Sequence, residues 1–180
     1  MQAFRHFSAT RPLTAAFATC LAKGSASDAI AQRHVEKVDK FDYARNIAFS
    51  VFSGAYLGIG QHFVYNVAFT RAFGAGTGML NASKKVIADS TIHVPMVYLP
   101  LYYSFKSVAL GEGTALDGLA RYRGDAYDVL TTYWSAWPAV HLVNFSVMPS
   151  ELRIHFVAAV SFVWLVYLSY ASHKDDERVT

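Results

Sequence analysis

The strongest constraint on the fold of this chain is the way its charged side chains are distributed. Asp, Glu, Lys and Arg make up 16% of the 180 residues, whereas they make up about a quarter of an ordinary soluble domain. They gather in short clusters, and the stretches between the clusters are almost free of charge. This alternation is typical of several membrane helices joined by loops. The 53% hydrophobic content and the abundant Tyr, Phe and Trp agree with it, because aromatic rings anchor helix ends at the lipid–water boundary.

Five segments have the length and composition of membrane helices, and Gly, Pro or charged clusters separate them. They are residues 12–32, 44–73, 84–111, 127–148 and 151–172. The first is only weakly apolar, so whether it crosses fully is left open. Pro95 and Pro100 in the third segment and Pro138 in the fourth remove backbone donors and predict kinks,. The sequence therefore predicts an all-α fold, a polytopic membrane helical bundle of four to five helices, in a single domain spanning residues 12–172.

The two ends of the chain are more polar than this domain. Residues 1–11 contain Arg5 and Arg11 with Ser, Thr and Ala, and no acidic residue precedes Asp28. Such a segment is similar to an uncleaved mitochondrial targeting sequence, although a basic flank of the first membrane helix has the same composition. Residues 173–180 are predicted to be a solvated tail.

Composition and motifs also exclude several classes of function. The single cysteine, Cys20, rules out an intrachain disulfide and a cysteine-rich zinc site,. A net charge of +3 spread over many loops argues against nucleic-acid binding,. The chain lacks the phosphate-loop, HExxH and GxSxG motifs,. We therefore predict that it is not an enzyme and needs no cofactor or metal.

Small side chains recur every four residues in the first two predicted helices. Residues four apart share one helix face, and small residues let two backbones approach closely. We expect the two stripes to pack on each other or on a partner, and their polar ends to cluster. The packing residues are Cys20, Gly24, Ser50, Gly54 and Gly58, and the polar ends are Asp28, Gln32 and His62.

The third and fourth predicted helices contribute further polar candidates. Asp89 and His93 are one turn apart, so they can hydrogen-bond, hold a proton or supply two metal ligands. A hydrogen-bonded pair is favoured over a metal site, because structural zinc sites need four ligands. In the fourth helix, Pro138 predicts a bend, and His141 and Asn144 share the inner face. That face is either a hydrogen-bonded packing seam or part of a pore.

The C-terminal third contains a specific motif. The run WSAWPAVHLVNFSVMP is similar to the signature of one family, that of the twenty-two-kilodalton peroxisomal membrane protein and the mitochondrial inner-membrane Mpv-seventeen protein. The matching residues are Trp134, Trp137, Pro138, Asn144, Phe145, Pro149, Arg153, Trp164, Tyr167, Leu168 and Ser169. Weaker similarities upstream involve Gly24, Asp28, Gln32, Gly58, His62, Lys85, Asp89 and Pro95.

The resemblance implies a small helical protein of the mitochondrial inner membrane or, alternatively, the peroxisomal membrane. It also implies solute permeation or membrane maintenance, with no cofactor. The chain departs from the family pattern at Ile59, Val64, Ser90 and His141. Because these are polar or kink positions, they bear directly on any pore.

Two functions remain open at this point. The first is a channel in which polar side chains converge on a water-filled path, namely Asp28, Gln32, His62, Asp89, His93, His141 and Asn144. The second is an accessory subunit of a large inner-membrane complex, such as a respiratory or ATP-synthase assembly. The expected partners are membrane lipids, other subunits of such a complex, or further copies of the chain.

Overall fold

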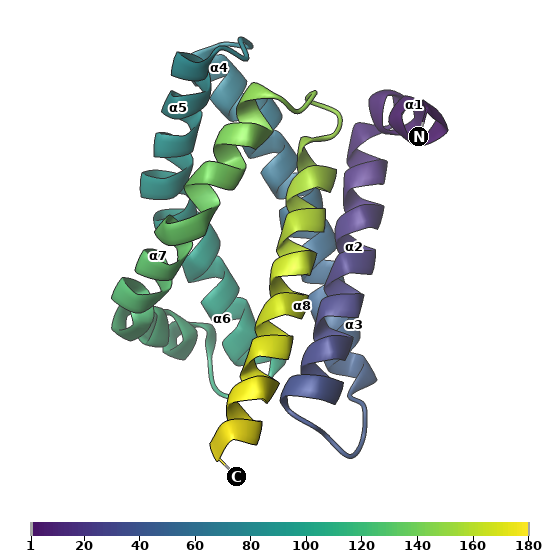
Figure 1. Cartoon of the computed structure of the whole chain (residues 1–180), viewed down its shortest axis with the longest axis vertical. Coiled ribbons are helices and arrows are strands. Elements are labelled where there is room, and N and C mark those ends of the chain that lie inside the picture. The colour runs from purple at the N-terminus through teal and green to yellow at the C-terminus, as the bar shows by residue number, and fades with distance from the viewer. Residues whose placement is uncertain (1, 180) are drawn as a thin grey trace. The chain divides into compact units, whose positions relative to one another are not determined.

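The computed structural model describes the backbone of residues 2–179 and the side chains of residues 2–166. Within this part every regular element is a helix, which confirms the predicted all-α class (Figure 1). Six continuous helical stretches run over residues 2–10, 12–35, 43–73, 79–109, 115–146 and 153–179. Five of these overlap the predicted segments, and the short first stretch lies in the predicted basic flank. The side chains of the predicted tail, residues 173–180, lie outside the described part.

One described helix is both long and apolar enough to cross a membrane, namely Tyr43–Phe73. The helix Arg153–Val166 is apolar but shorter. The predicted number of four to five membrane helices therefore stays a prediction. Pro95 and Pro138 do lie inside helices, and the kinks expected there also stay predictions.

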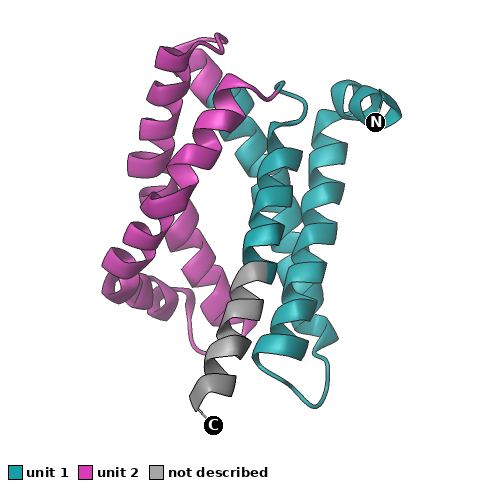
Figure 2. Ribbon diagram, in the orientation of Figure 1, with its two compact units in different colours: residues 1–68, 149–180 teal, residues 69–148 magenta. Residues whose placement is uncertain are grey.

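The chain separates into two compact units (Figure 2). Unit 1 comprises residues 1–68 and 149–180, and unit 2 comprises residues 69–148. The elements of unit 1 are α1 (Gln2–Thr10), α2 (Pro12–Ile30), η1 (Ala31–Val35), α3 (Tyr43–Phe52), η2 (Ser53–Gly60), η3 (Phe63–Ala68) and α8 (Arg153–Val179). Those of unit 2 are α4 (Phe69–Phe73), α5 (Met79–Ala88), η4 (Asp89–Tyr98), α6 (Leu99–Ala109) and α7 (Ala115–Ser146). The η elements are π-helical.

Unit 1 is built on an antiparallel pair, with α2 and η1 against α3 and η2. A Cβ atom added to Gly24 would lie 2.6 Å from the Cβ of Ser53, and one added to Gly58 would lie 2.8 Å from the carbonyl oxygen of Ala16. The Ser53 hydroxyl donates to the carbonyl oxygen of Cys20 at 2.7 Å. The two small-residue stripes thus lie face to face, and their backbones are close because the side chains between them are small. α8 packs beside α2 (Figure 1).

Unit 2 is a helical hairpin in which residues 79–109 pack against α7. The turn between them uses Gly111 at φ +66° and Gly113 at φ +150°, backbone angles that favour glycine,. Thr114 and Asp117 then form a reciprocal capping box that begins α7,. Val94, Leu99 and Tyr122 form the apolar core, and the Tyr122 hydroxyl donates to the carbonyl oxygen of Pro95 at 2.7 Å.

Candidate functional site

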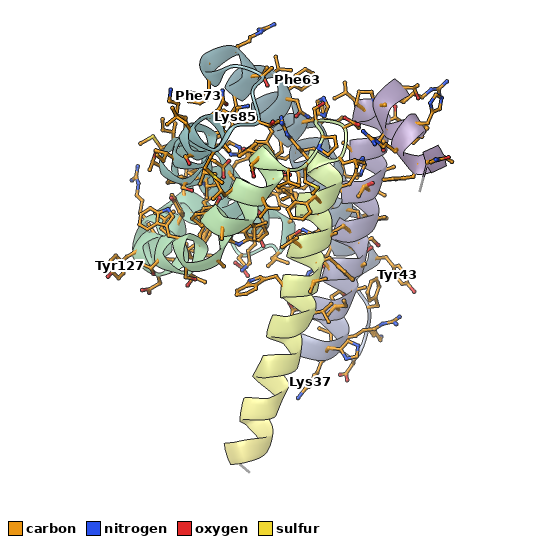
Figure 3. The ribbon with its side chains drawn as sticks, turned by 45° about the horizontal axis from the view of Figure 1, so that its top comes forward. Lys37, Tyr43, Phe63, Phe73, Lys85 and Tyr127 are labelled. Atoms are coloured by element: carbon orange, nitrogen blue, oxygen red, sulfur yellow. The ribbon has the colours of Figure 1, made fainter. Side chains whose placement is uncertain are left out.

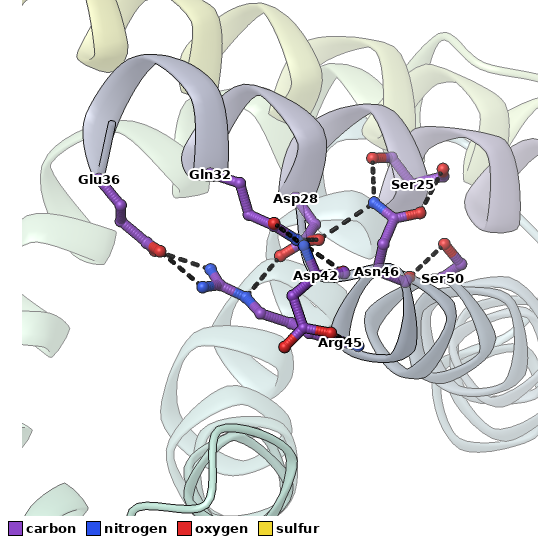
Figure 4. Close-up of polar contacts among 8 residues, drawn as sticks. All are labelled: Ser25, Asp28, Gln32, Glu36, Asp42, Arg45, Asn46 and Ser50. Atoms are coloured by element: carbon purple, nitrogen blue, oxygen red, sulfur yellow. Dashed lines mark hydrogen bonds and ion pairs between the residues drawn. The ribbon is translucent and has the colours of Figure 1, made fainter. Parts of the chain in front are cut away.

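The polar candidates of unit 1 begin with Asp28, which lies at the centre of a hydrogen-bond network between α2 and α3 (Figure 4). The Arg45 Nε donates to Asp28 Oδ1 at 2.9 Å, and its two terminal nitrogens donate to the carboxylate of Glu36. The side chain of Asp28 is only 4% exposed. A buried carboxylate of this kind needs a paired cation, and Arg45 is that cation.

Two amides complete this network. Gln32 donates to Asp28 Oδ2 at 2.7 Å, and its own oxygen accepts the backbone N–H of Asp42 at 2.7 Å. Asn46 donates to Asp28 Oδ2 at 3.0 Å and to the carbonyl oxygen of Ser25 at 2.9 Å. Asp42 in turn caps α3 by accepting the backbone N–H of Arg45 at 2.9 Å. The network therefore ties the connector after η1 to the start of α3.

His62 does not join Asp28 and Gln32, contrary to our expectation that the polar ends of the two stripes would cluster. The two helices are antiparallel, so Asp28 lies beside Asn46 and the opposite end of α2 lies beside Gly58. His62 instead contacts the Asn66 amide nitrogen at 3.2 Å. The oxygen of Asn66 accepts a hydrogen bond from Arg153 at 3.1 Å, so this pair holds the start of α8.

Unit 2 contains the second buried carboxylate, Asp89, at the start of η4. The Nδ1 atom of His93 lies 2.7 Å from Asp89 Oδ1, and the Tyr133 hydroxyl donates to Oδ2 at 2.7 Å. The Nε2 atom of His141 lies 3.5 Å from the same oxygen. Asp89 is fully buried. Side chains from η4 and α7 thus converge on one carboxylate, and we call Asp89, His93, Tyr133 and His141 the Asp89 cluster.

Asn144 lies one helical turn beyond His141 and is also fully buried. Within the described part of the chain, neither its amide nitrogen nor its amide oxygen has a hydrogen-bond partner. Buried amides are nearly always hydrogen-bonded, because each one left unsatisfied costs about 1–3 kcal/mol. Lys85, on α5, is a further fully buried polar side chain of this unit. Figure 3 shows it among the side chains of unit 2, whereas Tyr127 projects outward.

Aromatic side chains of the C-terminal motif surround the Asp89 cluster. The Trp134 indole donates to the carbonyl oxygen of Ser90 at 3.0 Å. Trp137 stacks on Tyr133 at a centroid distance of 6.1 Å, and Phe145 stacks on His141 at 6.0 Å. These contacts hold the hydroxyl and the imidazole against Asp89. The side chains of the motif residues Tyr167, Leu168 and Ser169 lie outside the described residues.

Among the residues that the structure describes, no group of three or more His, Cys, Asp or Glu side chains could hold a metal ion. The Asp89 cluster can instead hold, accept or pass on a proton, because it combines a carboxylate, two imidazoles and a phenol.

Several site residues were not among our candidates. Arg45 and Asn46 were missed because they meet Asp28 only after the connector that follows η1 reverses the direction of the chain. A helical pattern does not reveal the course of that connector. Tyr133 lies one turn before Trp137 and could have been found as part of the inner stripe of α7. Asn66 carries no pattern that links it to Arg153, which lies 87 residues away.

Comparisons with known proteins place the chain beside one group of membrane proteins. A sequence profile described as the Mpv17 / PMP22 family matches residues 109–169, a range that includes α7 and the start of α8. Protein SYM1 of Debaryomyces hansenii is 28% identical over 97% of this chain and 90% of its own length. The mitochondrial inner membrane protein Mpv17 of Rattus norvegicus is 35% identical over 55% of each chain. PXMP2/4 family protein 3 of Dictyostelium discoideum is 27% identical over 82% of this chain and 77% of its own.

No solved structure is significantly similar to this chain. The predicted location in the mitochondrial inner membrane is confirmed by the relatives whose names give it, in rat and in human. The motif around Trp137 and Asn144 lies on α7, and the similarity to SYM1 extends over 97% of this chain. The chain is similar to the Mpv17 / PMP22 family of membrane proteins.

Proposed function

We propose that the chain forms a passage for small polar solutes through the inner membrane, lined in part by the Asp89 cluster and Asn144. The observation that carries this proposal is the buried amide of Asn144, which has no hydrogen-bond partner among the described residues. A water molecule or polar solute beside Asn144 would satisfy both its donor and its acceptor. Polar side chains inside membrane segments usually face such a path or a partner.

The backbone around Asp89 supports this proposal. Asp89 and His93 lie in η4, a π-helical stretch of ten residues that also contains Pro95. π-helical turns are rare and occur frequently at functional sites. The wider turn changes the direction of the side chains that follow it. In our proposal this geometry aims Asp89 and His93 at α7.

The proposal also includes the membrane topology. Several helices besides Tyr43–Phe73 cross the membrane, although their buried polar residues lower their hydropathy. Pro95 and Pro138 bend the helices that contain them, because neither ring nitrogen can donate to the preceding turn. Such bends are tolerated in membranes where neighbouring side chains satisfy the backbone, and the Tyr122 hydroxyl already binds the carbonyl oxygen of Pro95.

An accessory subunit of an inner-membrane complex is the second candidate. The observation that favours it is the Asp28 network, in which every named carboxylate and amide has partners within unit 1. A scaffold needs such closed networks and needs no solute path. The two candidates differ in what they predict for Asn144, because only the passage requires water to reach it.

Solute flux distinguishes the candidates. The purified chain is reconstituted in liposomes, and the shrinking and swelling that follow addition of glycerol or a small sugar are recorded by light scattering. We expect faster solute entry than in protein-free liposomes, and a loss of that increase in Asn144→Leu and His141→Leu. Val143→Leu, at an exposed position of α7, is the matched control. Liposomes that hold folded protein yet stay as tight as protein-free ones would refute the passage.

A further inference from the structure

A groove on unit 1 is separate from both polar sites described above. It lies between α2 and α8 and has a volume of about 290 Å³. Its apolar walls are formed by Ala22, Ala26, Ala158, Ala159 and Phe162. Four of these five side chains are single methyl groups, so the two helix backbones form a shallow, open channel. The opposite face of α2, with Cys20 and Gly24, is already occupied by η2 and α3.

Three polar side chains also line the groove, and they differ in how they are satisfied. The Thr19 hydroxyl and His155 Nδ1 lie 2.8 Å apart, and the other ring nitrogen of His155 lies 3.1 Å from the Ser8 hydroxyl. These groups bind one another. Lys23 is different, because it makes no hydrogen bond or ion pair with any described residue. The described residues that line the groove therefore include an amine and no carboxylate to neutralise it.

The position of Lys23 along α2 matters for the kind of anion that could pair with it. It lies twelve residues after Arg11 and ten before Arg33. At 1.5 Å per residue these two arginines are roughly 33 Å apart, close to the thickness of the hydrocarbon layer, about 30 Å. Lys23 thus lies near the middle of its helix. Lipid headgroups lie at the ends of such a span, whereas an acidic side chain on another helix can lie at its middle.

We propose that this groove receives a membrane helix of a partner protein, and that an Asp or Glu of that helix pairs with Lys23. Charge complementarity indicates that the partner side chain is acidic, because ionisable side chains within membrane segments pair with one another. The alanine side chains that line the groove indicate that the occupant is a helix, because small side chains allow close backbone packing between membrane helices. The proposal rests on the proposed crossing of the membrane by α2, but it does not involve the Asp89 cluster and holds whether or not the chain conducts solutes.

A designed probe helix tests the proposal on the full chain. The probe is a Leu/Ala membrane peptide with one central Glu, and its partner probe carries Gln at that position. Binding to the chain in phosphatidylcholine vesicles is followed by energy transfer between fluorescent labels. We expect the Glu probe to bind at least about fivefold more tightly than the Gln probe, and this preference to disappear in Lys23→Gln.

Three further variants keep the test independent of folding. Ala159→Phe fills the groove from an exposed position, so we expect it to weaken the Glu probe without lowering the unfolding temperature. Ile47→Phe, at an exposed position of α3, and Lys84→Gln, at an exposed lysine of α5, are the controls and should change nothing. Equal binding of the two probes, or Glu-selective binding that survives Lys23→Gln, would overturn the proposal. The proposal would also be overturned if anionic lipid bound in the groove in preference to the Glu probe.

Discussion

Among the residues whose side chains the structure describes, each unit of this protein buries one aspartate, and the two aspartates have different partners. Asp28 in unit 1 faces Arg45, and two amides hold its second oxygen. Asp89 in unit 2 faces two imidazoles and a phenol, all of which can gain or lose a proton. A guanidinium stays charged under all physiological conditions, whereas an imidazole does not. The first site is therefore a permanent ion pair, and the second is a site whose charge and hydrogen bonds can change.

Two asparagines, the half-buried Asn46 and the buried Asn144, repeat this difference. Asn46 donates two hydrogen bonds and accepts one from the Ser25 hydroxyl at 2.9 Å. Asn144 has no partner within the described residues. A buried amide without internal partners does not stabilise the fold, so a water molecule or solute beside it explains it better. The predictions below test this contrast, in order of expected effect.

Removing the cation of the Asp28–Arg45 ion pair should have the largest effect on stability. Arg45→Gln leaves the buried carboxylate of Asp28 uncompensated, and breaking a buried pair in this way costs about 3–5 kcal/mol. We expect a loss of about 3 kcal/mol, near the lower end, because the Arg45 side chain retains 14% exposure. Chemical unfolding in detergent measures it.

A second substitution shows whether the lost charge is the cause. The double variant Asp28→Asn with Arg45→Gln should recover much of the stability, because no buried charge remains. Arg71→Gln, at an exposed position of α4, is the control and should be neutral. An Arg45→Gln variant as stable as the control would show that the Asp28–Arg45 ion pair does not stabilise the fold.

Replacing each asparagine by leucine should change the stability of the protein differently in the two cases. Asn46→Leu removes three hydrogen bonds and should cost about 2 kcal/mol of unfolding free energy. Asn144→Leu removes none that is made within the described chain, so stability should be unchanged or should rise by about 1 kcal/mol. Thermal unfolding of both variants in the same detergent gives the comparison. Equal destabilisation would mean that the Asn144 amide is satisfied inside the fold.

The smallest expected effect is a pH dependence at the capping box that begins α7. The pKa of Asp117 is lowered by hydrogen bonds from the Thr114 hydroxyl and the Thr114 backbone N–H. A carboxylate with a lowered pKa stabilises the fold above the ordinary Asp pKa of about 4, and this contribution is lost as the pH falls through the lowered value. The stability difference between the protein and Asp117→Asn should therefore shrink from pH 6 to pH 3. Asp128→Asn, at an exposed position of the same helix, should show no such trend.

Local pairs in these sites could be predicted from spacing, and distant ones could not. The pairs Asp28–Gln32 and Asp89–His93 are each four residues apart, and helical geometry alone brings them together,. His141 and Asn144 were expected on the inner face, and both are buried. The position of His62 depends on whether α2 and α3 run parallel or antiparallel, which small-residue spacing does not reveal. Arg45 reaches Asp28 only because the connector folds back, and no helical period encodes that fold.

The backbone also departs from what spacing can predict. Residues 89–98 and 53–60 are π-helical, and a period of 3.6 residues does not describe their faces,. The π-helical stretch at Asp89 brings Tyr133, from α7, onto the same carboxylate as His93. The sequence indicated which helices carry the polar groups. Where these polar groups come together depends on how the helices pack, which spacing along the chain does not predict.

The most direct test of the central claim is whether water reaches Asn144. Cys20 is the sole cysteine of the chain and is buried, so Asn144→Cys combined with Cys20→Ser introduces one informative thiol. This variant is reconstituted in liposomes and treated with a charged, membrane-impermeant methanethiosulfonate reagent, and labelling is measured by mass spectrometry. A solute passage predicts that the thiol at position 144 is labelled while native Cys20 in the unmodified chain is not. A folded variant whose thiol at position 144 stays unlabelled would contradict the account.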